Sequence, residues 1–154
     1  MARMLKASCP WGRWGRRPAR AGTAPHFAFG HGLGYKTWEY ESAGADSAQV
    51  LDESALGVTV VVRNTGSRVG REVVQAYVEP HSLEGGRPLR TLAAFATVTA
   101  KPGRAAEARP AIPARAFARY DEASGGWVRP PGEFTVRIGR SSADLRLSVR
   151  VRSG

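Results

Sequence analysis

Hydrophobic and polar residues alternate along several short segments in the second part of the chain. The clearest is segment 56–63, where leucine and valine occupy every second position while Thr59 and Arg63 fall on the opposite face. A period of two residues is that of a β-strand with one buried face. The sequence Asn-Thr-Gly-Ser at 64–67 is typical of a turn that uses asparagine side-chain hydrogen bonds and a positive φ at glycine. We therefore predict a strand over 56–63 and a turn at 64–67.

Similar alternation predicts further strands, each ended by proline, glycine or polar turn residues. They lie at 72–79, in the second half of 87–98, at 107–112, at 133–139 and at 145–151. Pro110 has no N–H group to donate to a neighbouring strand, so we expect the segment around it at a sheet edge or a strand end. In the last segment Arg146, Arg150 and Arg152 alternate with apolar residues. We expect them to face water and to protect a terminal strand from edge pairing, with binding to an acidic surface as the alternative.

The region between these strands breaks the alternating pattern. Segment 114–120 is rich in alanine and is too short for a stable helix, so we expect a brief strand or turn that buries Phe117 and Tyr120. Segment 121–127 contains aspartate, serine and two glycines, and has the composition of a hairpin loop. Trp127 ends that segment, near the tip of the predicted hairpin.

About seven short strands and no predicted helix of three turns indicate an all-β fold. The spacing is typical of an antiparallel β-sandwich of the immunoglobulin or fibronectin type III-like kind. A chain of 154 residues has room for one such domain but not for a second domain of enzyme size. We divide it into a disordered or aberrant basic tail at 1–24, a junction or docking segment at 25–45, and the sandwich at 46–154.

The net charge of +10 is concentrated at the N-terminus. Six of the 23 basic side chains lie in the first 24 residues, which contain no Asp or Glu, so that 17 basic and 13 acidic side chains remain in the rest of the chain. Lysine is scarce while arginine and alanine are frequent, which fits a compositional bias. A protein that binds nucleic acid is expected to concentrate basic residues on its folded surface, so we predict no nucleic-acid partner.

The first 24 residues do not form a recognisable targeting signal. They lack the apolar stretch of about 7 to 15 residues that a secretory signal needs, and neither Arg16-Arg17 nor Cys9 stands in the apolar context of an export or lipid-attachment signal. No segment reaches the roughly 18 apolar residues needed to cross a bilayer. Cys9 is the single cysteine, so no intrachain disulfide is expected. We expect a soluble protein without a membrane partner, and its compartment stays open.

Two stretches resemble one family. Residues 26–40 (HFAFGHGLGYKTWEY) resemble the F-P-F-G-H-G-L-S-Y-T-x-F-x-Y signature that precedes the last domain of family 3 glycoside hydrolases. Residues 60–78 resemble the V-x-V-x-N-T-G-x-x-x-G-x-E-V-V-Q-x-Y-V core of the fibronectin type III-like domain of those enzymes. Shorter motifs follow in the family's order, although Ala28 and Gly34 depart from the usual proline and serine. Residues 25–154 thus resemble the C-terminal domain of a β-glucosidase-like protein.

The resemblance implies an accessory role for this chain. The family's catalytic barrel and the α/β sandwich after it would need several hundred residues upstream, where this chain has 24 that resemble neither. We therefore expect an N-terminally truncated product, from a frameshift, a misplaced start codon or gene decay, that is inactive alone. Its implied partners are the catalytic domains of a family 3 glycoside hydrolase. The family's junction motif implies a docking loop formed by Phe27, Phe29, Gly30, His31, Gly32, Leu33 and Tyr35.

The residues themselves offer no catalytic or metal site. Retaining glycoside hydrolysis needs two carboxyl groups about 5 Å apart. Asp121 and Glu122, like Asp52 and Glu53, are sequence neighbours, and neighbours on an extended backbone point to opposite sides. The three histidines are too scattered for a metal site, and no nucleotide-binding motif is present. We predict no catalytic residue, metal or cofactor in this chain.

Two other interpretations stay open. Trp127 is a candidate for stacking on a sugar ring, which would make the chain a free-standing carbohydrate-binding module with β-glucan as its ligand. The arginine row of the last strand would suit a protein-interaction module. Trp38 and Tyr77 fall in strands and are expected in the core.

Overall fold

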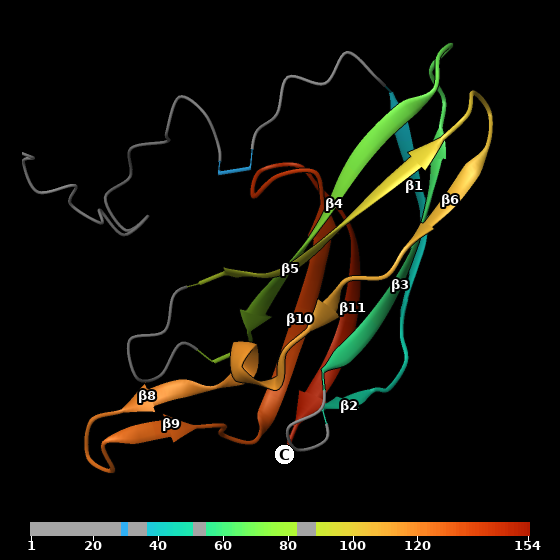
Figure 1. Cartoon of the computed structure of the whole chain (residues 1–154). Coiled ribbons are helices and arrows are strands. Elements are labelled where there is room, and N and C mark those ends of the chain that lie inside the picture. The colour runs from blue at the N-terminus through green and yellow to red at the C-terminus, as the bar shows by residue number, and fades with distance from the viewer. Residues whose placement is uncertain (1–28, 31–36, 51–54, 83–88) are drawn as a thin grey trace, which may run out of the picture.

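The computed structural model describes residues 29–30, 37–50, 55–82 and 89–154 of the chain (Figure 1). These residues form eleven β-strands and one short 3-10 helix. Seven of the strands have four or more residues, which matches the number predicted from the sequence. The elements are β1 (Trp38–Ala45), β2 (Gln49–Val50), β3 (Leu56–Asn64), β4 (Gly70–Pro80), β5 (Thr91–Ala100), β6 (Ala105–Ala108), β7 (Ala111–Ile112), η3 (Ala114–Phe117), β8 (Arg119–Asp121), β9 (Gly126–Val128), β10 (Gly132–Gly139) and β11 (Leu145–Ser153).

Two sheets pack against each other as a sandwich. The first has the order β1-β3-β6, with β7 paired to one end of β3, and the second has the order β2-β11-β10-β4-β5. The long strands pair antiparallel, and only the short contact between β11 and β2 is parallel. β8 and β9 form a separate two-stranded ribbon that extends to the lower left of Figure 1. The predicted all-β sandwich is confirmed.

Every second side chain of the long strands points between the two sheets and forms the core. The alternation is clearest in β3, in which each even-numbered position is buried. Phe117 of η3 closes one end of the core, where its ring is perpendicular to that of Phe134 with 5.2 Å between the ring centroids. Other buried core residues are Trp38, Leu56, Val58, Val60, Val62, Val74, Ala76, Ile112, Val136 and Ile138.

The segment around Pro110 behaves as its sequence predicts. β6 lies at the edge of the first sheet, and Pro110 separates it from β7. Pro110 is fully buried, and its carbonyl accepts a hydrogen bond of 3.1 Å from the Val58 N–H. The proline therefore ends one strand while its carbonyl still contributes to the pairing.

Two aromatic residues depart from their predicted places. Phe117 is buried as expected, but Tyr120 is 51% exposed, because the chain leaves the core directly after η3 and enters the projecting ribbon. Tyr77 is buried, yet it lies on the outer face of β4, since Val74, Ala76 and Val78 occupy the core side of that strand.

β1 belongs to the first sheet, although its residues fall within the segment that we assigned to the junction. It pairs with β3 from Trp38 opposite Asn64 to Ala45 opposite Val58, with a bulge between Tyr40 and Ser42. Among the described residues, no helix has the length and apolar character needed to span a membrane.

Candidate docking face

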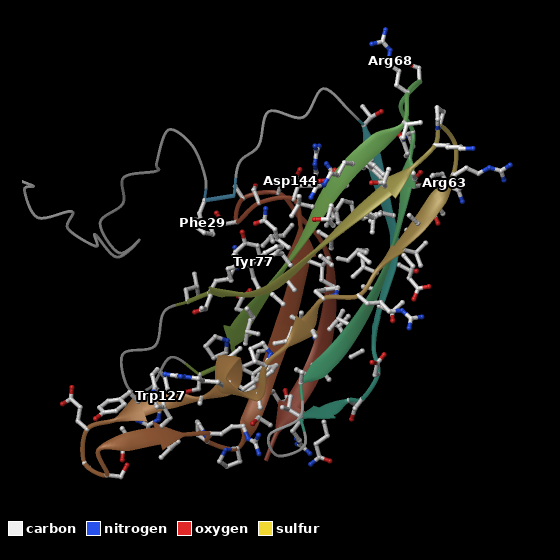
Figure 2. The ribbon with its side chains drawn as sticks, in the orientation of Figure 1. Phe29, Arg63, Arg68, Tyr77, Trp127 and Asp144 are labelled. Atoms are coloured by element: carbon white, nitrogen blue, oxygen red, sulfur yellow. The ribbon has the colours of Figure 1, made fainter. Side chains whose placement is uncertain are left out.

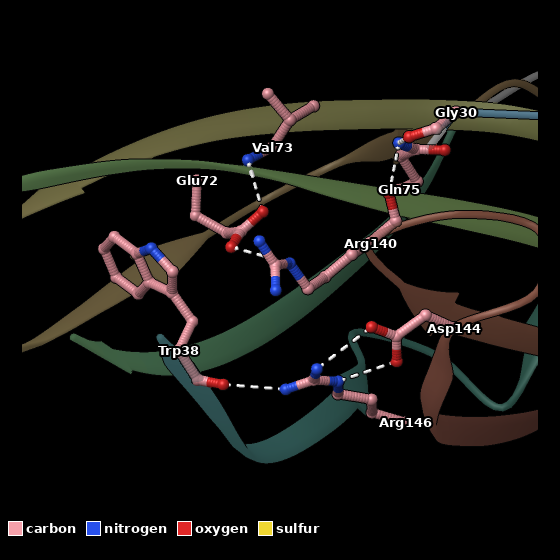
Figure 3. Close-up of polar contacts among 8 residues, drawn as sticks. All are labelled: Gly30, Trp38, Glu72, Val73, Gln75, Arg140, Asp144 and Arg146. Atoms are coloured by element: carbon pink, nitrogen blue, oxygen red, sulfur yellow. Dashed lines mark hydrogen bonds and ion pairs between the residues drawn. The ribbon is translucent and has the colours of Figure 1, made fainter. Parts of the chain in front are cut away.

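Phe29 and Gly30 are fixed to the outer face of the second sheet, and Figure 3 shows the contact of Gly30 with Gln75. The Gln75 side chain donates from Nε2 to the Gly30 carbonyl at 3.3 Å and to the Arg140 carbonyl at 2.6 Å. The backbone N–H of Ser142 donates to the Phe29 carbonyl at 2.9 Å. Two consecutive carbonyls are thus held, one by β4 and one by the turn that joins β10 to β11.

Gln75 is oriented for this task by its neighbour on the same face of β4. The Tyr77 hydroxyl donates to Gln75 Oε1 at 2.5 Å, which leaves the amide nitrogen facing the two carbonyls. Gln75 and Tyr77 are both buried, although this face of the sheet points away from the core. Because buried polar groups without partners are costly, this pairing favours one geometry for the anchor.

Glycine is strongly favoured at position 30 in this arrangement. Its φ is +79°, a conformation that costs other residues about 1–2 kcal/mol. A Cβ atom at this position would also lie 2.3 Å from Gln75 Oε1. The φ of Gly30 lets the backbone come close to the Gln75 side chain at this point.

The turn between β10 and β11 is held in shape by its own hydrogen bonds and by one from Arg90. The Arg140 N–H donates to the Asp144 carbonyl at 3.0 Å, and Ser141 Oγ accepts a hydrogen bond of 3.1 Å from the Asp144 N–H. Arg90 Nη1 donates to the Ser142 carbonyl at 2.9 Å. Because both backbone groups of Ser142 have partners, the turn presents its N–H to Phe29 in a fixed direction.

Two ion pairs hold this turn to the body of the sandwich (Figure 3). Arg140 Nε lies 3.1 Å from Glu72 Oε2, and the Glu72 side chain is buried. Arg146 makes two hydrogen bonds to Asp144, of 2.9 and 3.0 Å, and donates to the Trp38 carbonyl at 2.7 Å. The turn is therefore linked to strands of both sheets.

These contacts shift the pKa values of the groups involved. Burial raises the pKa of the Glu72 carboxyl, and the positive charge of Arg140 opposes that shift. Burial, and then the charge of Glu72, raise the pKa of Tyr40. The hydrogen bond from Arg146 lowers the pKa of Asp144. Glu72 is thus the carboxylate of this region whose ionised form is least favoured by its surroundings.

Exposed apolar side chains surround the anchor. Phe29 is 66% exposed and Phe95 is 67% exposed. Phe95 lies opposite Gln75 in the pairing of β4 with β5, so its side chain is on the same face of the sheet as Gln75. Val73, two positions before Gln75, lies on this face as well and is partly exposed. We call the surface formed by Phe29, Val73 and Phe95 the docking face.

The structure separates the predicted site residues. Phe29 and Gly30 lie on the docking face, whereas Trp127 lies on the ribbon formed by β8 and β9. Five further members of the predicted docking loop are outside the described residues: Phe27, His31, Gly32, Leu33 and Tyr35.

Sequence reasoning did not identify the groups that receive this loop. Local pattern places Gln75 and Phe95 in strands and Ser142 in a turn, with no contact to this loop. One available signal was Gln75 itself, an amide within a run of apolar residues in β4. The contacts with the turn depend on how distant strands pair, which the sequence does not show.

The arginine row is less free than its sequence suggests. Arg146 is paired with Asp144, and Arg152 lies 4.0 Å from Glu133. All three arginines are exposed, as predicted. The nearby acids Asp144 and Glu133 therefore reduce the positive charge that Arg146 and Arg152 offer to an acidic partner.

The two pairs of neighbouring acids weighed in the sequence differ in what the structure describes. Asp121 accepts two hydrogen bonds from Ser124, which lower its pKa and fold the hairpin loop. Glu122, its neighbour, is exposed, while Asp52 and Glu53 are outside the described residues. No group of three or more His, Cys, Asp or Glu side chains in the described ranges is arranged to hold a metal ion.

The sandwich and its anchored segment define a fibronectin type III-like domain. Residues 72–142, from Glu72 to Ser142 of the anchor, match the family model described as fibronectin type III-like domain. The solved β-glucosidase DesR from Streptomyces venezuelae superimposes with a TM-score of 0.77 and 32% identity over 86% of this chain and 17% of its own. The GH3 β-glucosidase of Bifidobacterium adolescentis gives the same TM-score and identity over 86% of this chain and 19% of its own.

Named relatives agree with these structures. Thermostable β-glucosidase B from Acetivibrio thermocellus is 40% identical over 134 residues, which is 86% of this chain and 18% of that protein. β-Glucosidase BoGH3A from Bacteroides ovatus is 32% identical, with 81% and 17% covered. This chain therefore belongs with the C-terminal fibronectin type III-like domains of family 3 glycoside hydrolases. It spans about a fifth of the length of the relatives that it matches.

Proposed function

We propose that this chain is an accessory domain that docks on the catalytic domains of a family 3 glycoside hydrolase and stabilises them without taking part in the chemistry. The observation that carries the proposal is the anchored segment. Gln75 and Ser142 hold Phe29 and Gly30 on the outer face of the second sheet, next to the strand that exposes Phe95.

The composition of the docking face supports this function. Two phenylalanine rings that are two-thirds exposed on one sheet face are unusual for a domain that works alone, and exposed apolar clusters mark interaction sites. Aromatic residues are enriched where protein surfaces meet. About four-fifths of the length of the matching relatives lies outside the matched region, which offers a partner within the same polypeptide.

A chimeric enzyme tests the proposal. Thermostable β-glucosidase B would be compared intact, without the region that this chain matches, and with that region replaced by this chain. We expect the chimera to hydrolyse an aryl β-glucoside and to survive heating longer than the deleted enzyme. A chimera that inactivates as fast as the deleted enzyme would refute the stabilising role. Turnover by the purified isolated chain that is lost when one of its acids is substituted would refute the non-catalytic role.

A pair of variants locates the contact within the chimera. Phe95→Asp places a charge at the centre of the docking face, and we expect it to shorten the half-life of the chimera at elevated temperature by about tenfold. Ala105→Asp is the matched control, because it adds the same charge at an exposed position of β6 in the opposite sheet. Equal half-lives for the two variants would exclude the outer face of the second sheet as the docking surface.

A further inference from the structure

The ribbon formed by β8 and β9 carries a second exposed cluster. Tyr120 and Trp127 lie opposite each other across the ribbon and are 51% and 55% exposed. Their rings meet edge to face, with centroids 5.8 Å apart and an interplanar angle of 74°. The guanidinium carbon of Arg115, from η3, lies 4.4 Å from the centroid of the Trp127 ring. We call these three residues the ribbon cluster.

The ribbon cluster is not required to complete the core. Phe117, two residues after Arg115, fills the end of the sandwich, and the ribbon belongs to neither of the two large sheets. A two-stranded ribbon alone is only marginally stable in water, and the contacts among the three side chains give this one its shape. The rings of Tyr120 and Trp127 are therefore held at the surface, where a partner could contact them.

The geometry of the cluster fits a protein surface better than a sugar chain. A sugar stacks on an open aromatic face, but the guanidinium of Arg115 already covers one face of the Trp127 ring. The steep angle between the two rings forms a corner, where a flat strip would be needed to bind successive sugars. Tryptophan, tyrosine and arginine are also the residue types that dominate the energy of protein interfaces.

The charge of Arg115 indicates the chemistry of the partner. Among the described residues, Arg119 lies 3.9 Å from Asp121, while the contact of Arg115 is with an aromatic ring. A guanidinium on an aromatic ring keeps donors that match a carboxylate. The complementary surface would present an apolar pocket for Trp127 with a carboxylate at its rim.

We propose that the ribbon cluster is a second docking contact and that it binds an apolar, acid-rimmed surface of the same catalytic domains that the docking face binds. This inference rests on the proposed function. In Figure 2, Phe29 and Trp127 both lie on the left side of the domain, with Phe29 well above Trp127. Two separated contacts would fix the orientation of the domain, whereas one contact leaves it free to pivot.

Hydrogen–deuterium exchange of the chimera described above tests the contact directly. We expect the amides of residues 119–128 to exchange about tenfold more slowly in the chimera than in the isolated full chain, because the ribbon becomes covered. Trp127→Ala should abolish that protection and shorten the half-life of the chimera at elevated temperature by about fivefold. Arg115→Lys, which keeps the charge but not the planar group, should produce part of the same loss. Equal exchange rates in the chimera and the isolated chain would overturn the inference.

Two further outcomes separate this inference from the proposed function. A chimera destabilised by Phe95→Asp but unaffected by Trp127→Ala would leave the docking face as the contact and remove the ribbon cluster. Binding of cello-oligosaccharides to the isolated chain that is lost in Trp127→Ala would also overturn the inference, because the occupant of the cluster would then be a sugar. A chimera with a protected ribbon that is no more stable than the deleted enzyme would contradict the proposed function alone.

Discussion

Asn64 provides a direct measure of how much one side chain contributes to this sandwich. It is completely buried at the end of β3 and donates from Nδ2 to the carbonyls of Arg68 and Ala100, each at 2.8 Å. Its Oδ1 accepts a hydrogen bond of 2.9 Å from the Gly66 N–H. Asn64 thus connects the turn after β3 with the end of β5.

Asn64→Ala removes all three hydrogen bonds. Each contributes about 1 kcal/mol net, and a buried group left unpaired costs about 1–3 kcal/mol. At least the Ala100 carbonyl lies in a buried contact, so we expect a loss of about 3–5 kcal/mol. Single domains have a free energy of unfolding of about 5–15 kcal/mol. The loss would therefore be a large fraction of the stability of the domain.

Asn64→Asp distinguishes the hydrogen bonds from simple loss of packing. A carboxylate keeps the acceptor for Gly66 but faces two carbonyl oxygens without a donor, so its folded-state pKa should be raised. The folded state then holds its proton more tightly than the unfolded state, and stability should rise as the pH falls through the folded-state pKa. Near neutral pH we expect Asn64→Asp to be at least as destabilising as Asn64→Ala.

Urea unfolding followed by tryptophan fluorescence measures both effects, because Trp38 is buried in the folded state. The experiment would be run near pH 4 and near pH 7 with wild type, Asn64→Ala and Asn64→Asp. A loss below about 1 kcal/mol for Asn64→Ala would contradict the reasoning, since that is the contribution of a single hydrogen bond. If the difference in free energy of unfolding between Asn64→Ala and Asn64→Asp were the same at both pH values, the role of Asn64 Nδ2 as a hydrogen-bond donor would be contradicted.

Two other predictions follow from the anchor. Gly30→Ala places a Cβ against Gln75 Oε1 in a backbone conformation that disfavours any side chain. We expect this to cost about 1–3 kcal/mol of local stability and to speed hydrogen exchange at the Ser142 amide. An unchanged exchange rate would contradict the anchor. Burial raises the pKa of Glu72, so ionising this carboxyl destabilises the folded state. That destabilisation is absent below the unfolded-state pKa and grows as the pH rises through the folded-state pKa. Urea unfolding between about pH 4 and pH 7 should therefore show Glu72→Gln gaining stability relative to wild type as the pH rises, and the opposite trend would refute the assignment.

Local pattern was sufficient for most of the strands because each is short, alternates with period two and ends at a breaker. β3 and β10 are the clearest cases, since all of their predicted inward apolar residues are buried, although Asn64 and Thr135 are buried as well. β1 was harder to recognise because its bulge between Tyr40 and Ser42 interrupts the alternation. A bulge inserts one residue and shifts the faces of those after it, so no single period describes the whole strand.

The turn at 64–67 shows a second limit of local reasoning. The predicted side-chain bond is present, from the Gly66 N–H to Asn64 Oδ1, but the predicted positive φ at Gly66 is wrong. Positive φ occurs in the described glycines Gly30, Gly103, Gly125 and Gly154. At Gly66 the requirement is space, because a Cβ there would lie 3.2 Å from Asn64 Oδ1. Sequence composition does not distinguish these two reasons for a glycine.

The candidate site was only half visible in the sequence for a topological reason. Phe29 and Gly30 were identified from one motif, but Gln75 and Ser142 reach them because β10 lies between β4 and β11 in the second sheet. These hydrogen-bonding residues are more than 40 positions apart in the sequence, and they come together only because of that strand order. Local pattern cannot supply it.

β4 connects the fold with the proposed docking. Its even positions, Val74 and Ala76 among them, pack in the core, while Gln75 and Tyr77 on the alternate positions build the anchor. A partner that binds only the folded chain stabilises it by mass action, and a partner held at the docking face would act through this strand. Under the proposed function, stabilisation is therefore reciprocal: a substitution that loosens the core of β4 should weaken docking, and docking should raise the free energy of unfolding of the sandwich.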